Sequence, residues 1–179
     1  MQAAIRVLGR DGLAAVTHRA VAAAAGVSVA LTTYHFGTLD ELLGASLAGE
    51  ARAGAARLAH ATDLARAGQI SLLDACAGHL IDLLGPHRGE FLASLEIRLS
   101  AARRATLHSA GQADAAFVDL ITTFTQDRPR AHAIYVKILG FAVASVLTSP
   151  VPTERETCEF TGGILAGYHL LDPEGKERP

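Results

Sequence analysis

A glycine that follows four consecutive alanines, Gly26, most constrains what this chain can fold into. Alanines let two helices approach each other closely, and a glycine after a helix suits a tight turn with a positive φ angle. Thr17 precedes this stretch and Ser28 follows the glycine, and each hydroxyl can cap the first turn of a helix. The pattern predicts a helix-turn-helix, with one short helix over residues 18–25 and another over 29–36.

The remainder of the chain also has the composition and periodicity of helices. Half of its 179 residues are hydrophobic but only 5% are aromatic, so aliphatic residues must form the core, and alanine and leucine lead the helix propensity scale. Hydroxyl and acidic residues at capping-box spacing begin three of the helical runs, at Thr38, Ser71 and Thr153. We expect an all-α protein with helices over 2–10, 18–25, 29–36, 39–62, 71–84, 88–109, 112–126, 130–148 and 154–171.

The predicted helices divide the chain into two domains. Residues 1–45 hold three short helices, as in a helix-turn-helix domain, whereas residues 46–179 hold longer helices that can form antiparallel hairpins. Phe36, Leu42 and Leu43 are expected to supply the core beneath the first domain. The second domain is expected to be a separate helical body.

Composition and motifs argue against several classes of protein. The formal net charge is -2, far from the strong positive charge of a protein that coats nucleic acid. Cys76 and Cys158 lack the spacing of a zinc site or a disulfide framework, and His18 and His35 fit no metal-ligand motif. The sequence contains no nucleophile elbow, phosphate-binding loop or HExxH motif. We therefore expect neither an enzyme nor a metal site nor a bound cofactor.

Membrane insertion and secretion are not expected. The N-terminus lacks the charged stretch followed by an apolar run that a signal peptide would show. The most apolar segment, 138–147, is shorter than the roughly 20 residues that cross a bilayer. We expect a cytoplasmic protein.

An ordered set of residues across the first domain matches a known pattern. The set contains Gly12, Thr17, Val21-Ala22, Ala25-Gly26-Val27-Ser28, Thr32 to Phe36, and Asp40-Glu41-Leu42-Leu43. In order and spacing it resembles the DNA-binding domain of the TetR/AcrR family of transcriptional regulators. The resemblance covers about the first quarter of the chain and implies a helix-turn-helix whose second helix enters the major groove of an operator.

The resemblance implies a set of DNA-contacting residues on both helices of the motif. Arg19 matches a position that reaches bases or backbone, and His35 matches a position on the phosphate side. Leu31 and the methyl group of Thr33 can contact thymine methyl groups. Phe36, by contrast, is expected in the core. The full set of expected contact residues is Thr17, Arg19, Ser28, Val29, Ala30, Leu31, Thr33, Tyr34 and His35.

Departures from the family pattern lower the affinity for DNA that we expect. Ala30 stands where the family often has glycine, and Leu39 stands where it often has a cation that contacts phosphate. Family members usually begin with a basic segment, whereas Met1 falls inside the first helix here, through a late start site or truncation. Residues 1–45 carry three arginines and three acidic residues. Binding is therefore expected to depend on dimerisation more than on charge.

The second domain resembles the family in architecture alone, which implies a ligand pocket between helices and a dimer interface from the last two long helices. Polar or aromatic residues on otherwise apolar helices are the pocket candidates, with core packing or solvent exposure as the alternative for each. Glu96 belongs to this set. The others are Cys76, His79, Phe91, Leu95, Arg98, Phe117, Ile121 and Phe124.

The segment 133–147 is apolar nearly all round, so a helix there must be covered on more than one side. The last helix can cover it, and the pair could form a four-helix bundle with a second copy of the chain. The alternative is a core helix of a monomer. Candidate interface residues are Ile138, Phe141, Ala142, Ser145, Ile164, Leu165 and Tyr168.

The resemblance as a whole implies a homodimeric regulator, usually a repressor, that a small molecule releases from a double-stranded DNA operator. Two recognition helices would then read half-sites about 34–36 Å apart or somewhat more. The alternative is a helical interaction protein that keeps the module with lost or weakened DNA binding. Leu39 and the uncharged balance of the first domain favour that alternative.

Overall fold

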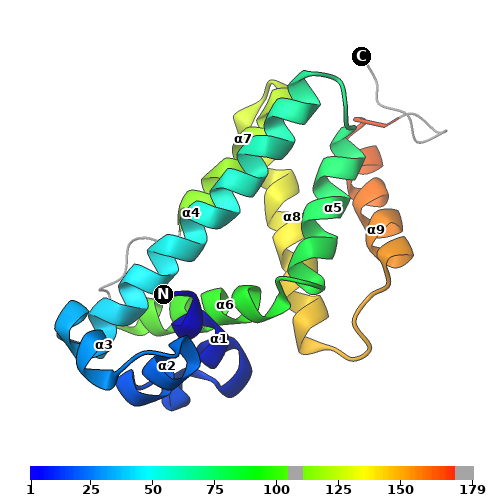
Figure 1. The fold of residues 1–179 in the computed structure, drawn as a ribbon. Helices are drawn as coiled ribbons and strands as arrows, with labels where there is room; N and C mark the ends of the chain where they lie inside the picture. Colours follow the sequence, from blue (N-terminus) through cyan, green and yellow to red (C-terminus); the bar gives the residue numbers. More distant parts are fainter. Residues whose placement is uncertain (105–110, 172–179) are drawn as a thin grey trace. The chain divides into compact units, whose positions relative to one another are not determined.

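The computed structural model describes the backbone of residues 1–104 and 111–171, and the side chains of 1–99 and 114–171. In this described part the regular elements are helices, and the predicted all-α fold class is confirmed (Figure 1). The elements are α1 (Gln2–Asp11), a 3-10 turn η1 (Leu13–Ala15), α2 (His18–Ala25), α3 (Val29–His35), α4 (Leu39–Arg66), α5 (Leu72–Leu84), α6 (Arg88–Arg104), α7 (Gly111–Thr125), α8 (Arg128–Leu147) and α9 (Glu154–Gly167).

Predicted and observed helices differ mainly at their ends. The helix predicted over 39–62 continues to Arg66, because the chain first turns at Gly68, whose φ angle is 66°. There the Gln69 N–H donates a hydrogen bond to the Leu64 carbonyl at 2.9 Å, which closes the helix. The turn η1 has no counterpart among the predicted elements, and the predicted end of the helix over 88–109 lies outside the described residues.

Hydrogen-bonded caps begin the helices for which hydroxyl–acid pairs predict them. At the start of α4 the Glu41 N–H donates to Thr38 Oγ1 at 3.2 Å, and the Glu41 carboxylate accepts from the Thr38 N–H at 3.4 Å. Both bonds of a capping box are also present at the start of α9. Ser71 caps α5, but its hydroxyl donates to the Asp74 carboxylate, because the shorter aspartate side chain turns to the hydroxyl instead of the backbone.

The chain forms two compact units, of which the first combines Met1–Gly54 with His87–Ala113. Within this unit α1 packs along α6. The two helices approach very closely at Gly9 and Gly89, since a Cβ atom built on Gly9 would lie 2.4 Å from the Gly89 carbonyl oxygen. This contact requires glycine for its lack of a side chain, and it joins the N-terminal helices to α6.

One apolar cluster holds the first unit together. Its buried members are Ala3, Ala4, Ile5, Val7, Leu8, Val16, Val21, Leu42, Leu43, Ala93 and Ile97. Phe36 and Leu39 pack against this cluster while staying partly exposed. Phe36 therefore packs with the core as the sequence predicts, and Leu39 contributes apolar packing at the place where the family pattern often has a cation.

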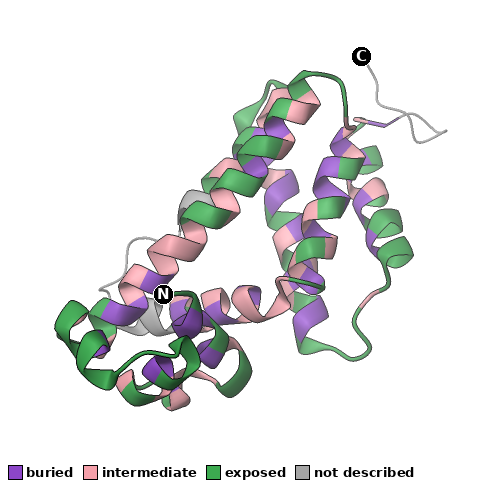
Figure 2. Cartoon of the chain, in the orientation of Figure 1, coloured by how far each residue is buried: buried purple, intermediate pink, exposed green. Residues whose placement is uncertain are grey.

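The second unit combines Ala55–Pro86 with Asp114–Pro179. In it α5 lies beside both α8 and α9, and α8 and α9 lie beside each other (Figure 1). Figure 2 shows that buried residues gather on the facing sides of these helices and exposed residues on their outer sides. The largest fully buried side chains of this unit are Leu72, Leu80, Leu120, Ile121, Ile134, Ile138, Leu165, Thr157 and Thr161.

The two compact units do not follow a division at residue 45. The helix α6 belongs to the unit that contains the N-terminal helices, and α4 begins in one unit and ends in the other. Compactness and function are separate criteria, because a functional module can share its core with a neighbouring helix. The functional division into residues 1–45 and 46–179 stays a prediction.

One helix of the described part, α8, is long and apolar enough to cross a membrane by length and composition alone. The apolar segment 138–147 is its second half. A core helix of a globular unit passes the same test, and α8 buries residues along its whole length inside the second unit. These residues are Ala131, Ile134, Tyr135, Ile138, Ala142, Ser145 and Val146.

Candidate functional site

The two helices of the predicted motif are both capped by hydroxyl side chains. Thr17 Oγ1 accepts a hydrogen bond from the Ala20 N–H at 3.1 Å, at the start of α2. Ser28 Oγ accepts one from the Leu31 N–H at 3.2 Å, at the start of α3. Each cap satisfies a backbone donor that the first turn of a helix leaves without a partner.

The turn between these helices has the conformation that the sequence predicts. Gly26 is left-handed, with φ 69° and ψ 31°. The Gly26 N–H donates to the Ala23 carbonyl at 3.3 Å, and the Val27 N–H donates to the Ala22 carbonyl at 3.0 Å. These two bonds form a Schellman motif, which ends α2 and sends the chain into α3.

All nine residues predicted to contact DNA are exposed (Figure 2). Tyr34 is 84% exposed, and Val29 and Leu31 are 43% and 44% exposed. Thr32, on the opposite side of α3, is buried, and its hydroxyl donates to the Val29 carbonyl at 2.8 Å. The motif therefore presents a free helix face of the kind that enters a major groove. The contacts to DNA themselves stay a prediction.

Two side chains from outside the motif support it. Arg6 of α1 donates to the Ala24 carbonyl, near the end of α2, at 3.1 Å. Glu96 of α6 accepts a hydrogen bond from the Leu13 N–H at 2.8 Å and so satisfies a backbone donor of η1. Local sequence patterns could not show the second bond, because its partners are 83 residues apart. Glu96, a candidate for the pocket, thus lies half-buried against η1 in the first unit.

The charges of the first 45 residues are mostly engaged within the unit. Arg10 and Asp11 form an ion pair at 2.7 Å, and the hydrogen bond from Arg10 lowers the pKa of the Asp11 carboxyl. Arg6 donates to a helix carbonyl. Within residues 1–45, all of which the structure describes, Arg19 is the arginine that makes no hydrogen bond or ion pair. It is the cation most available to a phosphate.

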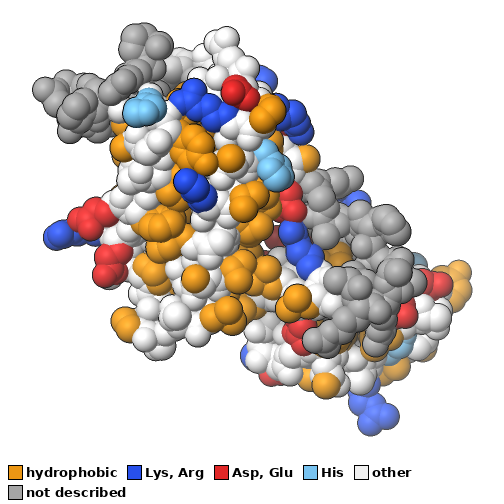
Figure 3. Space-filling view, turned by 180° about the vertical axis from the view of Figure 1, so that it is seen from behind, with side chains coloured by type: hydrophobic (Ala, Val, Ile, Leu, Met, Phe, Trp, Pro, Cys, Tyr) orange, Lys and Arg blue, Asp and Glu red, His pale blue; other side chains and the backbone are white. Residues whose placement is uncertain are grey.

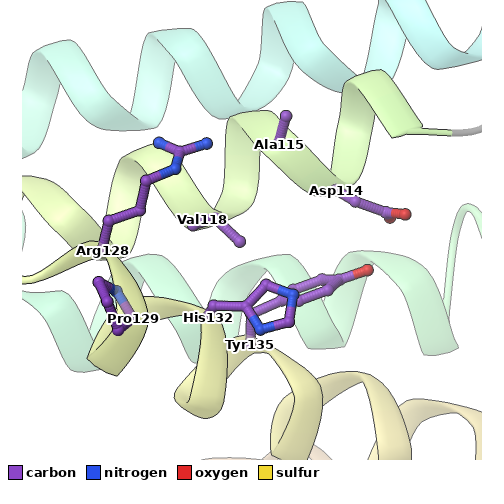
Figure 4. Close-up of a pocket in the computed structure, with 7 residues that line it drawn as sticks. All are labelled: Asp114, Ala115, Val118, Arg128, Pro129, His132 and Tyr135. Carbon is purple, nitrogen blue, oxygen red and sulfur yellow. The ribbon is translucent and has the colours of Figure 1, made fainter.

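A cavity of about 510 Å³ lies in the second unit and is lined by residues from the first halves of α7 and α8. Figure 4 shows the rings of His132 and Tyr135 on one wall, with Asp114 toward one end and Arg128 toward the other. Arg128 is ion-paired with Asp119. The lining residues are Asp114, Ala115, Val118, Arg128, Pro129, His132 and Tyr135.

A row of aromatic rings leads from this cavity into the interior of the unit. The ring centroids of His132 and Tyr135 are 6.1 Å apart, and Tyr135 meets Phe117 edge-on at 5.9 Å. Phe117 in turn lies 4.5 Å from His79. Two predicted pocket residues, His79 and Phe117, thus reach the cavity through Tyr135.

None of the nine predicted pocket residues lines the cavity itself. Cys76 and Ile121 are buried in the second unit, and Phe124 is half-buried there. Phe91, Leu95 and Arg98 lie on α6, which belongs to the first unit. The lining could not be found from the sequence, because it depends on how α7 and α8 pair. Contact of the predicted residues with a ligand stays a prediction.

The residues predicted for a dimer interface fall into two groups. Ile138, Ala142, Ser145 and Leu165 are at most 3% exposed, so they pack inside their own unit. The remaining three, Phe141, Ile164 and Tyr168, are partly exposed. Apolar periodicity could not separate the groups, because a helix face looks the same in sequence whether its own chain or a second copy covers it.

The outer surface of α8 and α9 is rich in hydrophobic side chains. Phe141 stacks on Phe160, with ring centroids 3.9 Å apart and an angle of 14° between the planes. Phe160 is 36% exposed, and Val136 and Leu147 are 50% and 78% exposed. Figure 3 shows hydrophobic side chains gathered on one face of this unit. Such a face is typical of an interface between proteins.

The described side chains form no group of three or more His, Cys, Asp or Glu residues that could hold a metal ion. Neither Cys76, which is buried, nor Cys158, which is exposed, forms a disulfide. The expectation that the whole chain binds no metal stays a prediction.

Comparison with known proteins connects the N-terminal motif with one family. The sequence model described as bacterial regulatory proteins, tetR family, matches residues 1–45. This segment contains α1, α2 and α3 with their capped turn. No curated protein sequence matches the chain.

Solved structures match nearly the whole chain. A member of the TetR family from Streptomyces coelicolor A3 is 32% identical, with a TM-score of 0.74, and the match covers 91% of this chain and 94% of that one. The multidrug binding protein EbrR complexed with imidazole is 33% identical, with a TM-score of 0.70 and coverage of 91% and 90%. The same protein complexed with ethidium is 33% identical, with a TM-score of 0.69 and coverage of 91% and 94%.

Proposed function

Because the chain belongs to the TetR family of bacterial regulatory proteins, we propose that it is a repressor that a small molecule releases from its operator. The observation that carries this proposal is the exposed face of α3, which follows α2 after a left-handed turn at Gly26. In the proposed division of labour, residues 1–45 bind DNA and residues 46–179 bind the ligand and a second copy of the chain. The protein acts in the cytoplasm and catalyses no reaction.

The proposed DNA contacts follow from exposure and helix geometry. The N-terminal part of α3, with Val29 and Ala30, enters the major groove, and Tyr34 projects from the same helix. Arg19 contacts a phosphate from α2. The N-terminus of α2, capped by Thr17, offers backbone N–H groups and a positive dipole end to a second phosphate.

The proposed dimer uses the outer surface of α8 and α9. The stacked pair Phe141–Phe160 lies on this surface together with the partly exposed Ile164 and Tyr168. Two helices from each copy would then form a four-helix bundle around a two-fold axis. The buried Ile138, Ala142, Ser145 and Leu165 support these helices from within the chain.

The proposed ligand is an aromatic cation held in the cavity between α7 and α8. His132 and Tyr135 offer ring faces and edges to an aromatic cation, and the Asp114 carboxylate lies in the same lining. The related protein EbrR has been crystallised with imidazole, proflavin, malachite green and ethidium, which are aromatic molecules. These complexes support an aromatic ligand for this chain.

A gel shift with the promoter fragment next to its own gene tests the operator part of the proposal. The protein should shift this fragment at low salt, and absence of any shift would contradict DNA binding. Malachite green should then abolish the shift, with the dye and DNA alone as a control. A shift that persists at saturating dye would contradict release by this ligand class.

Two matched variants test the cavity. Asp114→Asn removes a carboxylate from the lining, and should weaken malachite green binding several-fold while leaving the gel shift intact. Asp82→Asn removes an exposed carboxylate from α5 of the same unit and should change neither. Equal dye affinity in both variants would contradict the proposed role of Asp114.

A helical interaction protein is the second candidate function. It is favoured by Arg19 being the one available arginine of residues 1–45, and by the hydrophobic exposure of Val29 and Leu31 on α3. In that case α3 would contact a protein instead of a base pair. The gel shift separates the two candidates, because an interaction protein would not shift the fragment at any salt concentration.

A further inference from the structure

The helix α3 presents hydrocarbon where base-reading helices often present paired hydrogen-bonding groups. Its sequence, Val29–His35, contains no Arg, Lys, Asn, Gln, Asp or Glu. Those are the side chains that read base edges through bidentate or charge-assisted hydrogen bonds. The exposed positions near the start of the helix are instead Val29, Ala30 and Leu31.

The threonine hydroxyl groups of this helix are engaged by its own backbone. Thr33 Oγ1 lies 3.1 Å from each of the carbonyl oxygens of Val29 and Ala30, to which it donates. Because the Thr33 oxygen turns to the backbone, the methyl group is the part of this exposed side chain left for a partner. Ser28 is engaged as the cap of the helix. The exposed surface of α3 therefore presents methyl groups on both edges, from Val29 and Thr33 on one side and from Leu31 on the other, with Ala30 and Tyr34 between them.

Thymine supplies the matching chemistry in the major groove. Its C5-methyl group is the one hydrocarbon group that the base pairs display there, and it distinguishes a T·A pair from the other pairs. We infer that α3 reads its operator through thymine methyl groups, which pack against Val29, Leu31 and the methyl group of Thr33. The inference rests on the proposed function, since it assumes that α3 enters a major groove.

Single-atom changes in the DNA test this inference. The operator is first selected from a random double-stranded pool by the full chain, and each thymine of a half-site is then replaced in turn by deoxyuridine. Deoxyuridine lacks the methyl group but keeps the O4 acceptor. At each contacted thymine the affinity should fall about fourfold, the factor for one buried methyl-sized group, and elsewhere it should not change.

A second series restores the methyl group in another base. Replacing a contacted T·A pair by C·G should weaken binding, and replacing that cytosine by 5-methylcytosine should recover about fourfold. Leu31→Ala should bind the thymine and uracil operators with nearly equal affinity at the position that Leu31 contacts, so the ratio of the two affinities should be close to one. Tyr34→Phe, which removes a hydroxyl group and no methyl group, should leave that ratio unchanged. Thermal unfolding checks that both exposed-site variants fold.

The possible outcomes distinguish methyl recognition from operator binding itself. A selected operator that binds equally well with uracil at every half-site position would overturn methyl recognition and leave the operator function standing. Selection of no DNA sequence at all would overturn the operator function together with this inference. An affinity about fourfold higher for the thymine operator than for the uracil operator, lost in Leu31→Ala, would support both methyl recognition and the operator function.

Discussion

Single glycines in this chain serve different physical needs. Gly26 has a left-handed backbone, and a Cβ added there would meet nothing within 4 Å, so a side chain would cost conformational energy alone, roughly 1–2 kcal/mol. Gly9 has ordinary helical geometry but no space, because the Gly89 carbonyl lies against it. The first need is visible in sequence, since a glycine follows a helix. The second need cannot be seen in the sequence, because it depends on Gly89, which lies 80 positions away.

Gly9→Ala should destabilise the protein by about 1–3 kcal/mol, the range for overpacking a filled contact. The physical reason is that the added Cβ meets backbone, which cannot rotate aside as a side chain would. Urea unfolding measures the change. Gly78→Ala is the control, because its Cβ would have open space on an exposed side of α5 and should stabilise the helix by about 0.5–1 kcal/mol. Equal effects in the two variants would contradict the close α1–α6 contact.

Helices and their caps could be predicted from the sequence because their signals are local. Thr38 and Thr153 each lie three residues before a glutamate, and both pairs form the expected cap bonds. Bonds between distant elements have no such signal. Nothing in the local sequence distinguishes Glu96 on α6 from another glutamate on a helix, yet its carboxylate accepts a hydrogen bond from the Leu13 N–H. The lining of the cavity escaped prediction for the same reason, since it depends on how α7 and α8 pair.

Glu96→Ala should destabilise the first unit by about 1–3 kcal/mol, because it leaves the Leu13 N–H without its acceptor. Glu96→Gln keeps an oxygen acceptor at the same place and should lower the free energy of unfolding clearly less than Glu96→Ala does. Urea unfolding of both variants gives the two values. An alanine variant as stable as the native chain would show that the bond contributes nothing to the fold.

The capping box of α9 should make part of the stability depend on pH. Hydrogen bonds from the Thr153 backbone and then its side chain lower the pKa of Glu156 in the folded chain. A lowered pKa means that the ionised carboxylate stabilises the fold above the ordinary glutamate pKa, and this contribution is lost as the pH falls through the folded value.

The stability difference between the native chain and Glu156→Gln should therefore be full at neutral pH and disappear in acid, below about pH 4. Thermal unfolding from pH 7 to pH 3 measures it. Glu154→Gln removes a neighbouring charge outside the capping box and is the control. A difference that grows as the pH falls would contradict the assigned direction.

At the scale of the whole molecule, the same helices α8 and α9 must serve two purposes in the proposed dimer. Their inner faces complete the core of the second unit, and their outer faces carry Phe141, Phe160 and Leu147. The sequence shows that most of α8 is apolar nearly all round, but not which side of the helix each residue takes. The burial of Ile138 and Leu165 resolves that choice for the inner face.

Phe160→Asp should convert the proposed dimer into a monomer, because it places a charge beside Phe141 on the hydrophobic outer face. Sedimentation velocity measures the association state, and circular dichroism confirms that the helices remain. Ala59→Asp, at an exposed position of α4, adds the same charge elsewhere and should leave association unchanged. A Phe160→Asp variant that sediments with the native chain would exclude this face as the interface.

The isolation of Arg19 has a consequence for how a regulator of this kind searches a chromosome. Phosphate contacts add the same affinity for every sequence, so an N-terminal motif with one available arginine per copy holds bulk DNA weakly. Few molecules are then sequestered on irrelevant sites, and the freely diffusing pool stays large relative to the bound pool. In the proposed repressor, a small copy number can therefore fill the operator, and a dimer released by its ligand is held only weakly by neighbouring DNA.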